Sequence, residues 1–235
     1  NQITIQKANS ILEGEILLPA SKSISNRALI INYLSSKKLR LINFSQADDT
    51  QLMIDLLKII EENNGSYLPT KIDCRDAGTT LRFITALLAL TPGKWLITGS
   101  DRMKDRPIGI LVEGRKKLGA NIEYLGKDGF PPLLIKGKKL KGRELEIDGS
   151  VSSQFISALL LIAPSVPGGL CLKLKGKISS LPYIEMTLKL LNQFGISTSF
   201  IDNTITIKQQ DFKSGELTIE ADWTAASYWY EMVAL

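Results

Sequence analysis

An internal repeat is the feature that most constrains how this chain can fold. Two apolar segments, residues 83–90 and 155–162, match almost residue for residue at an offset of 72. Shifting the earlier part of the chain by 55 positions places Arg27 over Arg82. This register aligns two sets of residues: Ser25, Thr80 and Ser152, and Arg27, Arg82 and Gln154.

A second series of residues recurs with a similar period. Three helical patterns end at Gly65, Gly119 and Gly195, each followed by a strand pattern, and these glycines are 54 and 76 positions apart. A glycine just past a periodic segment is typical of a helix end. Because two independent features recur together, the sequence indicates a threefold structural repeat.

Each repeat has the same predicted order of elements. A short apolar strand, such as Ile16–Leu18, leads into a helix that is apolar beyond its first turn and is therefore expected to be buried. A second strand follows, then an amphipathic helix opened by Asp48, Pro107 or Pro182 and a closing hairpin. The sequence thus predicts an α/β fold built from three β-α-β-α-β-β units.

The end of the chain has the pattern of a fourth unit. Leu217–Ile219 is a predicted strand, and Asp222 leads into an apolar helix over Ala225–Leu235. The helical pattern stops without a glycine or a polar tail. We therefore expect the chain to be part of a larger protein.

The composition excludes several kinds of chemistry. The chain has 235 residues, 44% hydrophobic and 23% charged, a formal charge of +5 and no histidine. A Ser-His-Asp triad, a His-containing zinc site and a His-ligated haem are therefore excluded from it. Cys74 and Cys171 lie in strand-like runs with neither metal nor redox spacing, which favours buried, unreactive thiols. Lacking a signal peptide or long apolar run, the chain is expected in the cytoplasm.

The repeat predicts an anion-binding site. If three units pack around an approximate threefold axis, the N-termini of their buried helices converge, and unpaired N–H groups and helix dipoles favour anions there. The residues expected at this point are Lys22, Ser23, Ser25, Arg27, Gly78, Thr79, Thr80, Arg82, Ser152, Ser153 and Gln154.

Simpler interpretations exist for each of these features. Serine and threonine at helix starts usually cap the helix, and arginines often pair with surface carboxylates. The charged run 101–106 is typical of a solvated face. A basic cluster fits a solvated linker better than a nucleic-acid contact, since no aromatic residues alternate with it. It contains Lys136, Lys138, Lys139, Lys141 and Arg143. No glycine-rich nucleotide loop is present.

Five segments resemble motifs of the 5-enolpyruvylshikimate-3-phosphate synthase family. Residues 19–29 read P-A-S-K-S-I-S-N-R-A-L, similar to the family's P-G-S-K-S-x-S-N-R-A-L. Residues 76–82 resemble its N-A-G-T-A-x-R motif, and residues 102–108 resemble R-M-x-x-R-P-I. Residues 152–155 and 180–184 are similar to two further motifs. The motifs occur in the family's order over nearly the whole chain.

The resemblance implies a fold, a reaction and a set of site residues. The family has an inside-out α/β fold, with two domains of three β-α-β-α-β-β units each. It transfers a carboxyvinyl group from phosphoenolpyruvate to the 5-hydroxyl of shikimate 3-phosphate, without metal or cofactor. By motif position, phosphoenolpyruvate would contact Lys22, Gly78, Arg106 and Gln154. Shikimate 3-phosphate would contact Ser23, Arg27, Ser152, Ser153, Gln154, Ser180 and Tyr183. Thr79 and Arg82 would line the same cleft, and Lys22 is the candidate proton donor.

The resemblance also implies how the chain is divided. Residues 20–220 would form the complete N-terminal domain, while residues 1–19 and 221–235 would be edges of the second domain. Because that domain supplies the principal catalytic carboxylates in the family, the chain alone is expected to lack turnover. We expect a monomer that binds small anions, and neither nucleic acid nor a membrane.

Four positions differ from the family motifs, and two other functions remain as alternatives. Ala20, Asp76, Thr80 and Phe83 replace the usual Gly, Asn, Ala and Pro, and Asp76 is expected to be paired or turned away from the site. The alternatives are a UDP-N-acetylglucosamine enolpyruvyl transferase, whose reactive cysteine lies in a mobile loop, and a non-catalytic anion-binding module.

Overall fold

Two of the three predicted units have the same topology. The structure, a computed structural model, describes residues 13–234. The second unit contains β2 (Pro69–Asp73), α3 (Gly78–Leu88), β3 (Gly93–Thr98), α4 (Asp101–Lys104), α5 (Gly109–Lys117), β4 (Asn121–Tyr124) and β5 (Leu133–Gly137). The third contains β6 (Glu144–Asp148), α6 (Ser153–Ile162), the 3₁₀ turn η1 (Ala163–Ser165), β7 (Leu170–Lys175), α7 (Leu181–Gln193), β8 (Thr198–Ile201) and β9 (Thr204–Ile207). Their sheets have the orders β2-β3-β5-β4 and β6-β7-β9-β8, each with one parallel and two antiparallel pairs.

The first unit is assembled from both ends of the described chain. It contains α1 (Lys22–Leu34), β1 (Leu39–Ile42) and α2 (Asp48–Glu62), and its sheet is completed by β10 (Gly215–Thr218), which runs parallel to β1. After α2 the chain passes directly into β2, so no hairpin closes this unit. The prediction of three contiguous β-α-β-α-β-β units is therefore correct for the second and third units and wrong for the first.

One predicted strand does not form, and another forms but belongs to the first unit. Residues 16–18 form no strand, and Leu17 is 97% exposed. The strand predicted to open a fourth unit instead pairs with β1, where Leu217 is buried. β10 covers an edge of β1 that would otherwise present unpaired backbone groups. A short apolar run indicates strand propensity but does not identify the strand with which it pairs.

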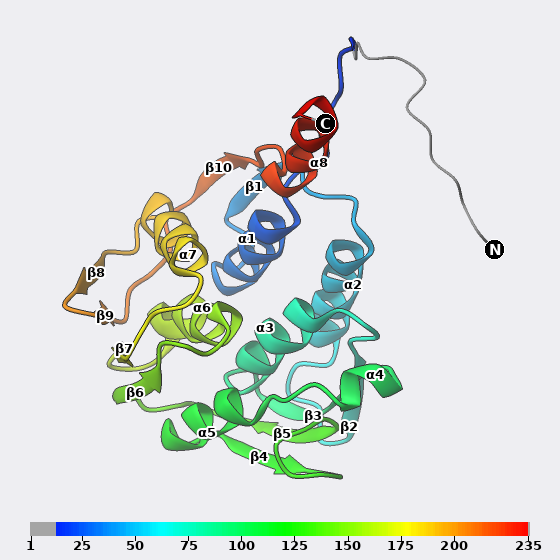
Figure 1. Ribbon diagram of the computed structural model, residues 1–235. Helices are drawn as coiled ribbons and strands as arrows, with labels where there is room; N and C mark the ends of the chain where they lie inside the picture. Colours follow the sequence, from blue (N-terminus) through cyan, green and yellow to red (C-terminus); the bar gives the residue numbers. More distant parts are fainter. Residues whose placement is uncertain (1–12, 235) are drawn as a thin grey trace.

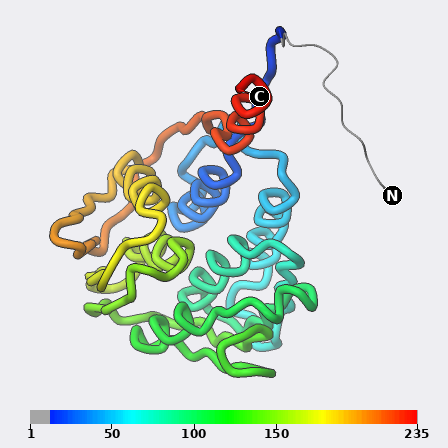
Figure 2. The backbone as a smooth tube through the Cα atoms, in the orientation of Figure 1, coloured from blue at the N-terminus to red at the C-terminus, as the bar shows by residue number. Residues whose placement is uncertain are grey.

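Helices occupy the centre of the molecule and sheets its outside. Figure 1 shows α1, α3 and α6 grouped in the middle, with the three sheets at the periphery, and Figure 2 traces the same backbone in the same orientation. These three helices contact one another directly. Almost every residue of α3 and α6 is buried, because both helices are apolar on all faces beyond the first turn. This arrangement is the inside-out α/β fold that the resemblance implies.

The helix ends and most of the linker follow the sequence predictions. Gly65, Gly119 and Gly195 have φ values of 83°, 90° and 83°, the left-handed conformation that glycine adopts without steric cost after a helix. The lysines and the arginine of the basic cluster at 136–143 are all exposed, but Lys136 belongs to β5, so the linker prediction is correct only for the residues after it. No helix within residues 13–234 is long and apolar enough to cross a membrane.

The cysteines differ in their surroundings. Cys74 follows β2 and is fully buried, and burial raises the pKa of its thiol. Cys171 lies in β7 but is only half-buried, and its sulfur accepts a hydrogen bond from Thr206 Oγ1 at 3.7 Å. The prediction of two buried thiols is correct for Cys74 alone, because side chains alternate between the faces of a strand and Cys171 is on the less covered face.

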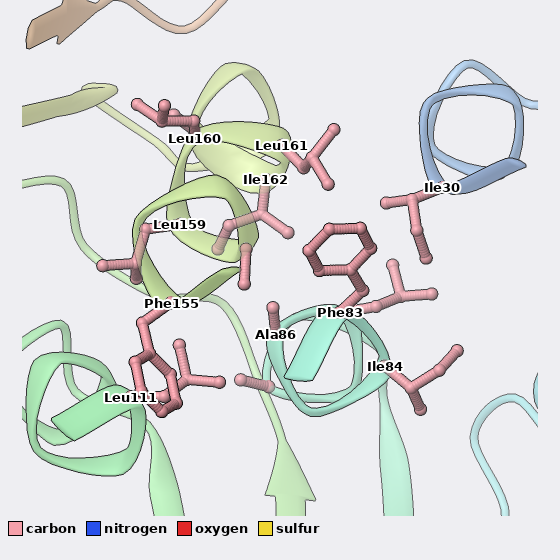
Figure 3. Close-up of a cluster of buried hydrophobic side chains, with 14 of the residues drawn as sticks. Ile30, Phe83, Ile84, Ala86, Leu111, Phe155, Leu159, Leu160, Leu161 and Ile162 are labelled. Atoms are coloured by element: carbon pink, nitrogen blue, oxygen red, sulfur yellow. The ribbon is translucent and has the colours of Figure 1, made fainter. Parts of the chain in front are cut away.

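The core around Phe83 gives a direct test of this packing. Figure 3 shows the Phe83 ring between Ile30 of α1 and Ile162 of α6. Because Phe83 is fully buried, Phe83→Ala should lower the free energy of unfolding by about 3–5 kcal/mol in urea denaturation. Tyr67→Ala, at a side chain that is 88% exposed, should change it by less than about 0.5 kcal/mol. Equal effects of the two substitutions would contradict the core described here.

Candidate anion-binding site

The N-terminal ends of α1, α3, α6 and α7 surround one hollow, as the repeat predicts for the buried helices. Its volume is about 220 Å³. The residues that line it are Lys22, Ser23, Asn26, Arg27, Thr79, Ser152, Ser153, Gln154, Ser180 and Tyr183. All except Asn26 are residues nominated from the sequence.

Arg27 forms the floor of the hollow and is held by neutral groups. Its side chain is 2% exposed, and burial lowers its pKa to about 10, so it stays protonated at neutral pH. Nε donates to Thr187 Oγ1 at 2.8 Å and Nη2 to Ser157 Oγ at 3.1 Å, while Nη1 donates to the carbonyl of Ser23 at 2.8 Å. The guanidinium thus brings positive charge to the hollow without an ion-pair partner among the described residues.

Aromatic rings on two elements enclose the same guanidinium. Its central carbon lies 5.4 Å from the ring centroid of Phe83 and 5.7 Å from that of Tyr183. Such contacts stabilise a partly desolvated cation. Phe83, which departs from the family motif, is therefore a core residue beneath Arg27.

Two further arginines meet at the start of α3. Arg82 Nη1 donates to the carbonyl of Gly78 at 2.9 Å, and a Cβ atom built on Gly78 would lie 2.6 Å from Arg106 Nη1 and 2.9 Å from Arg82 Nη1. Burial first, and then the charge of Arg106, lowers the pKa of Arg82. Glycine is needed here because any side chain would occupy the space where the two guanidinium groups approach the helix terminus.

Gln154 connects this arginine pair to the hollow. Its Oε1 accepts a hydrogen bond from Arg82 Nη1 at 3.0 Å. Arg82 also stacks over Phe155, with its central carbon 4.9 Å from the ring centroid. The alignment of Arg82 with Gln154 in the repeat therefore corresponds to a direct contact, and Gly78, Arg82 and Arg106 adjoin the hollow.

Lys22 stands at the rim, close to two carboxylates. Its Nζ lies 3.2 Å from Asp49 Oδ2 at the start of α2, and its backbone N–H donates to Asp222 Oδ2 at 3.3 Å. The Lys22 side chain is 46% exposed, so solvent weakens this ion pair. The ammonium group is accessible from the hollow and is not committed to a buried partner.

Only some of the serine and threonine hydroxyls near the helix starts cap their helices. Ser152 Oγ accepts from the N–H of Gln154 at 3.4 Å, so the capping interpretation is correct for Ser152. α3 begins after Ala77 with no side-chain cap, and Ser180 precedes α7 at φ 56° without capping it. The first N–H groups of α3 are thus left for a ligand or solvent, whereas at the start of α7 Pro182 has no N–H and the N–H of Tyr183 donates to the carbonyl of Ser180 at 3.1 Å.

Asn26 is the residue of the hollow that the sequence prediction misses. It is fully buried, and neither its Nδ2 nor its Oδ1 has a hydrogen-bond partner in the described structure. Asn26 lies inside the quoted S-N-R motif, so its position between Ser25 and Arg27 was a signal. Asp49 and Asp222 are also missed, because nothing in their local sequence indicates contact with Lys22.

Asp76 and Thr80, which depart from the family motif, make their side-chain hydrogen bonds outside the hollow. Asp76 Oδ1 accepts a hydrogen bond from Ser100 Oγ at 2.5 Å, which confirms that this carboxylate is paired. Thr80 is buried, and its hydroxyl donates to the carbonyl of Asp49 at 3.3 Å. The interpretation of the charged run 101–106 as a solvated face is correct for part of it. Asp101 pairs with Lys104 at 2.8 Å in solvent, whereas the guanidinium of Arg106 lies against Gly78.

The combined site suits ligands with several negative charges. Three arginines, Lys22 and the free N–H groups of helix starts are the donors that phosphate and carboxylate groups prefer. Within residues 13–234, no group of His, Cys, Asp or Glu side chains could hold a metal ion. The geometry is that of an oxyanion site made from cations, hydroxyls and backbone amides.

Comparisons with known proteins agree with one another. A family model described as EPSP synthase (3-phosphoshikimate 1-carboxyvinyltransferase) matches residues 6–235. The 3-phosphoshikimate 1-carboxyvinyltransferase of Bacteroides fragilis strain YCH46 is 50% identical over 229 residues, which cover 97% of this chain and 54% of that protein. The protein of that name from Shewanella amazonensis is 40% identical over 241 residues, covering 93% and 56%. The chain spans about half the length of the curated relatives it matches.

A solved structure shares the fold. EPSP synthase from Acinetobacter baumannii superimposes with a TM-score of 0.76 over 92% of this chain and 51% of that protein. The two sequences are 18% identical, so this likeness concerns the fold alone.

Gly78 gives a test of the oxyanion site. In Gly78→Ala the new Cβ displaces the ends of two flexible side chains, so we expect the fold to persist and the dissociation constant for inorganic phosphate to rise about tenfold. Calorimetric titration measures this change. Gly126→Ala is the control, because its Cβ would meet nothing closer than Pro132 Cδ at 3.8 Å. Unchanged phosphate affinity in Gly78→Ala would contradict an anion held between the two guanidinium groups.

Proposed function

Because this chain belongs to the EPSP synthase family, we propose that it provides one half of the site that transfers a carboxyvinyl group from phosphoenolpyruvate to shikimate 3-phosphate. In this reaction the 5-hydroxyl gives its proton to a general base as its oxygen bonds to C2 of phosphoenolpyruvate, and C3 takes up a proton, which gives a tetrahedral adduct. Loss of a C3 proton then expels inorganic phosphate. The observation that carries the proposal is the single hollow in which helix starts, Arg27 and Lys22 come together.

Shikimate 3-phosphate is assigned to the hollow itself. Its phosphate and hydroxyl groups need several donors, and the lining offers hydroxyls on α1, α6 and α7 together with the Arg27 charge. The residues assigned to it are Ser23, Arg27, Ser152, Ser153, Gln154, Ser180 and Tyr183. The Tyr183 ring packs over Arg27, so the same side chain can cover one face of the ligand ring.

Phosphoenolpyruvate is assigned to the adjoining arginine pair. Its phosphate and carboxylate would relieve the repulsion between Arg82 and Arg106, which otherwise face each other across Gly78. Lys22 and Gln154, which are assigned to phosphoenolpyruvate, also line the hollow, and Gln154 is hydrogen-bonded to Arg82. Under this assignment the two substrates would be bound side by side, as transfer from one to the other requires.

Lys22 is assigned the central role in the chemistry of this half. A Lys22 ammonium at the rim can donate a proton to C3 of phosphoenolpyruvate or stabilise negative charge on the adduct. Its partner Asp49 is solvent-accessible, so an anionic ligand can replace that contact. No metal or cofactor is required for either role.

The remaining groups are assigned to a second domain. The relatives are about twice as long as the matched region, which supports a division into residues 20–220 as one complete domain and 1–19 and 221–235 as edges of another. Residues 1–12 lie outside the described part of the chain. α8 (Trp223–Ala234) supports the division, because most of its large apolar side chains are exposed and only Ala226 is buried.

Other parts of the assignment follow from the same site. The UDP-N-acetylglucosamine enolpyruvyl transferase alternative is disfavoured because Cys74 is buried after β2 and Cys171 lies in a strand. We assign small anions as the ligands rather than nucleic acid, and a monomer in the cytoplasm as the working state.

Binding of shikimate 3-phosphate tests the function. Calorimetric titration of the chain should show saturable binding, and Lys22→Met should weaken it at least about tenfold because a charge at the rim is lost. Lys71→Met removes an exposed cation that pairs with Asp73 on β2, away from the hollow, and should leave the affinity unchanged. No binding by the unmodified chain would contradict the proposal.

Turnover provides a second test. The chain alone, supplied with both substrates, should release no phosphate in the steady state, because the carboxylates assigned to the second domain are missing. A coupled phosphate assay measures this directly. Sustained phosphate release would show that residues 1–235 suffice for catalysis and would overturn the assignment of essential groups to a second domain.

A further inference from the structure

A second buried arginine lies below the site and outside every motif quoted above. Arg115, on α5, is 0% exposed. Burial lowers its pKa to about 9, so it is protonated at neutral pH. No carboxylate of residues 13–234 forms an ion pair with it. A desolvated cation without a counter-ion is costly, which raises the question of what it does in the core.

The Arg115 guanidinium bridges two of the central helices. Nη1 donates to the carbonyl of Ala86 on α3 at 2.9 Å, and Nη2 donates to the carbonyl of Ala158 on α6 at 3.3 Å. The planar group thus contacts both helices at once, as its fork of N–H donors allows. Figure 3 shows the three helices side by side, with Leu111 on α5, Ala86 on α3 and Leu159 on α6.

The two bridged carbonyls lie directly below the site. Ala86 is four residues after Arg82, and Ala158 is four residues after Gln154, which in a helix is about one turn. Arg82 and Gln154 are themselves hydrogen-bonded at 3.0 Å. The same pair of helices is therefore joined twice, once at the site and once a turn deeper by Arg115.

The start of α5 is also close in sequence to a residue of the site. It begins at Gly109, three residues after Arg106, whose guanidinium lies against Gly78. Holding α5 against α3 and α6 therefore holds Arg106 relative to Arg82 and Gln154. Arg106 and Gln154 are assigned to phosphoenolpyruvate, and Arg82 borders that subsite. Gln154 is also assigned to shikimate 3-phosphate, but Arg27, which is assigned to that ligand alone, is bonded to Thr187 of α7 and Ser157 of α6 independently of Arg115.

We propose that Arg115 is a positioning residue for the phosphoenolpyruvate subsite, which it holds in register by bridging α3 and α6 from α5. This inference rests on the proposed function only for the identity of the ligand. The competing explanation is that Arg115 merely fills the core. A methionine of similar length would fill that space without the bridge, so the two explanations differ in what Arg115→Met does to the site.

The test compares Arg115→Met and Arg115→Lys with the unmodified 235-residue chain. Lys117→Met is the matched control, since it removes an exposed cation from the same helix. Calorimetry gives the dissociation constants for phosphoenolpyruvate and shikimate 3-phosphate. Proton–nitrogen NMR of the Gln154 side-chain amide, recorded without ligand, reports on the Arg82–Gln154 contact.

In Arg115→Met we expect phosphoenolpyruvate affinity to fall about tenfold, shikimate 3-phosphate affinity to change less than about twofold, and the Gln154 amide resonance to shift. Arg115→Lys, which can reach one carbonyl at a time, should give a smaller but equally selective loss, and Lys117→Met none. Selective loss in Arg115→Lys decides for the proposal if Arg115→Met does not fold.

Three results would overturn the proposal: unchanged phosphoenolpyruvate affinity in the folded Arg115→Met chain, equal weakening of both ligands, or no selective loss in Arg115→Lys. If the unmodified chain binds neither ligand, the proposed function fails instead. The ligand-free Gln154 shift then still decides whether Arg115 sets the helix register.

Discussion

The site depends on the burial of three apolar helices against one another. α3 and α6 have almost no polar face beyond their first turn, so water can be excluded from them only by other elements on every side. The sheets cover the outside, and α1 completes the central group. Because each helix enters this group from the same end, their polar first turns gather at one point. The binding chemistry is thus a geometric consequence of how the core is closed.

Positive charge inside that core is held without carboxylates. Arg27, Arg82 and Arg115 are all partly or fully desolvated, and burial lowers the pKa of each. Most of their donors are satisfied by hydroxyls, an amide oxygen and backbone carbonyls, which are neutral acceptors, whereas Nε of Arg82 and Nε of Arg115 have no hydrogen-bond partner in the described structure. A carboxylate partner would cancel the positive field at the site. Neutral partners leave that field available to an anionic ligand.

Much of this was predictable from local pattern. Apolar periodicity identified α3 and α6, and glycine stops identified the ends of three helices. The repeat predicted that the starts of the buried helices converge, and in the structure Arg82 and Gln154, which share one repeat position, are hydrogen-bonded. Motif resemblance brought distant residues such as Ser180 and Tyr183 to the same hollow as Lys22. The assigned substrate contacts remain predictions.

The predictions that were wrong or incomplete all concern contacts between segments far apart in the sequence. β10 pairs with β1 across most of the chain, and no local signal distinguishes it from the start of a new unit. The contact of Lys22 with Asp49 and the burial of Asn26 likewise depend on how α1 lies relative to its neighbours.

By itself, the sequence determined the repeat, the buried character of its helices and the cationic, histidine-free chemistry, because these follow from residue type and spacing along one segment. Only the tertiary structure decided which strand completes the first sheet, which of the arginines lie at or beside the hollow, and that Arg115 bridges α3 and α6. Each of those depends on distances between segments far apart in sequence, which packing of the whole core sets.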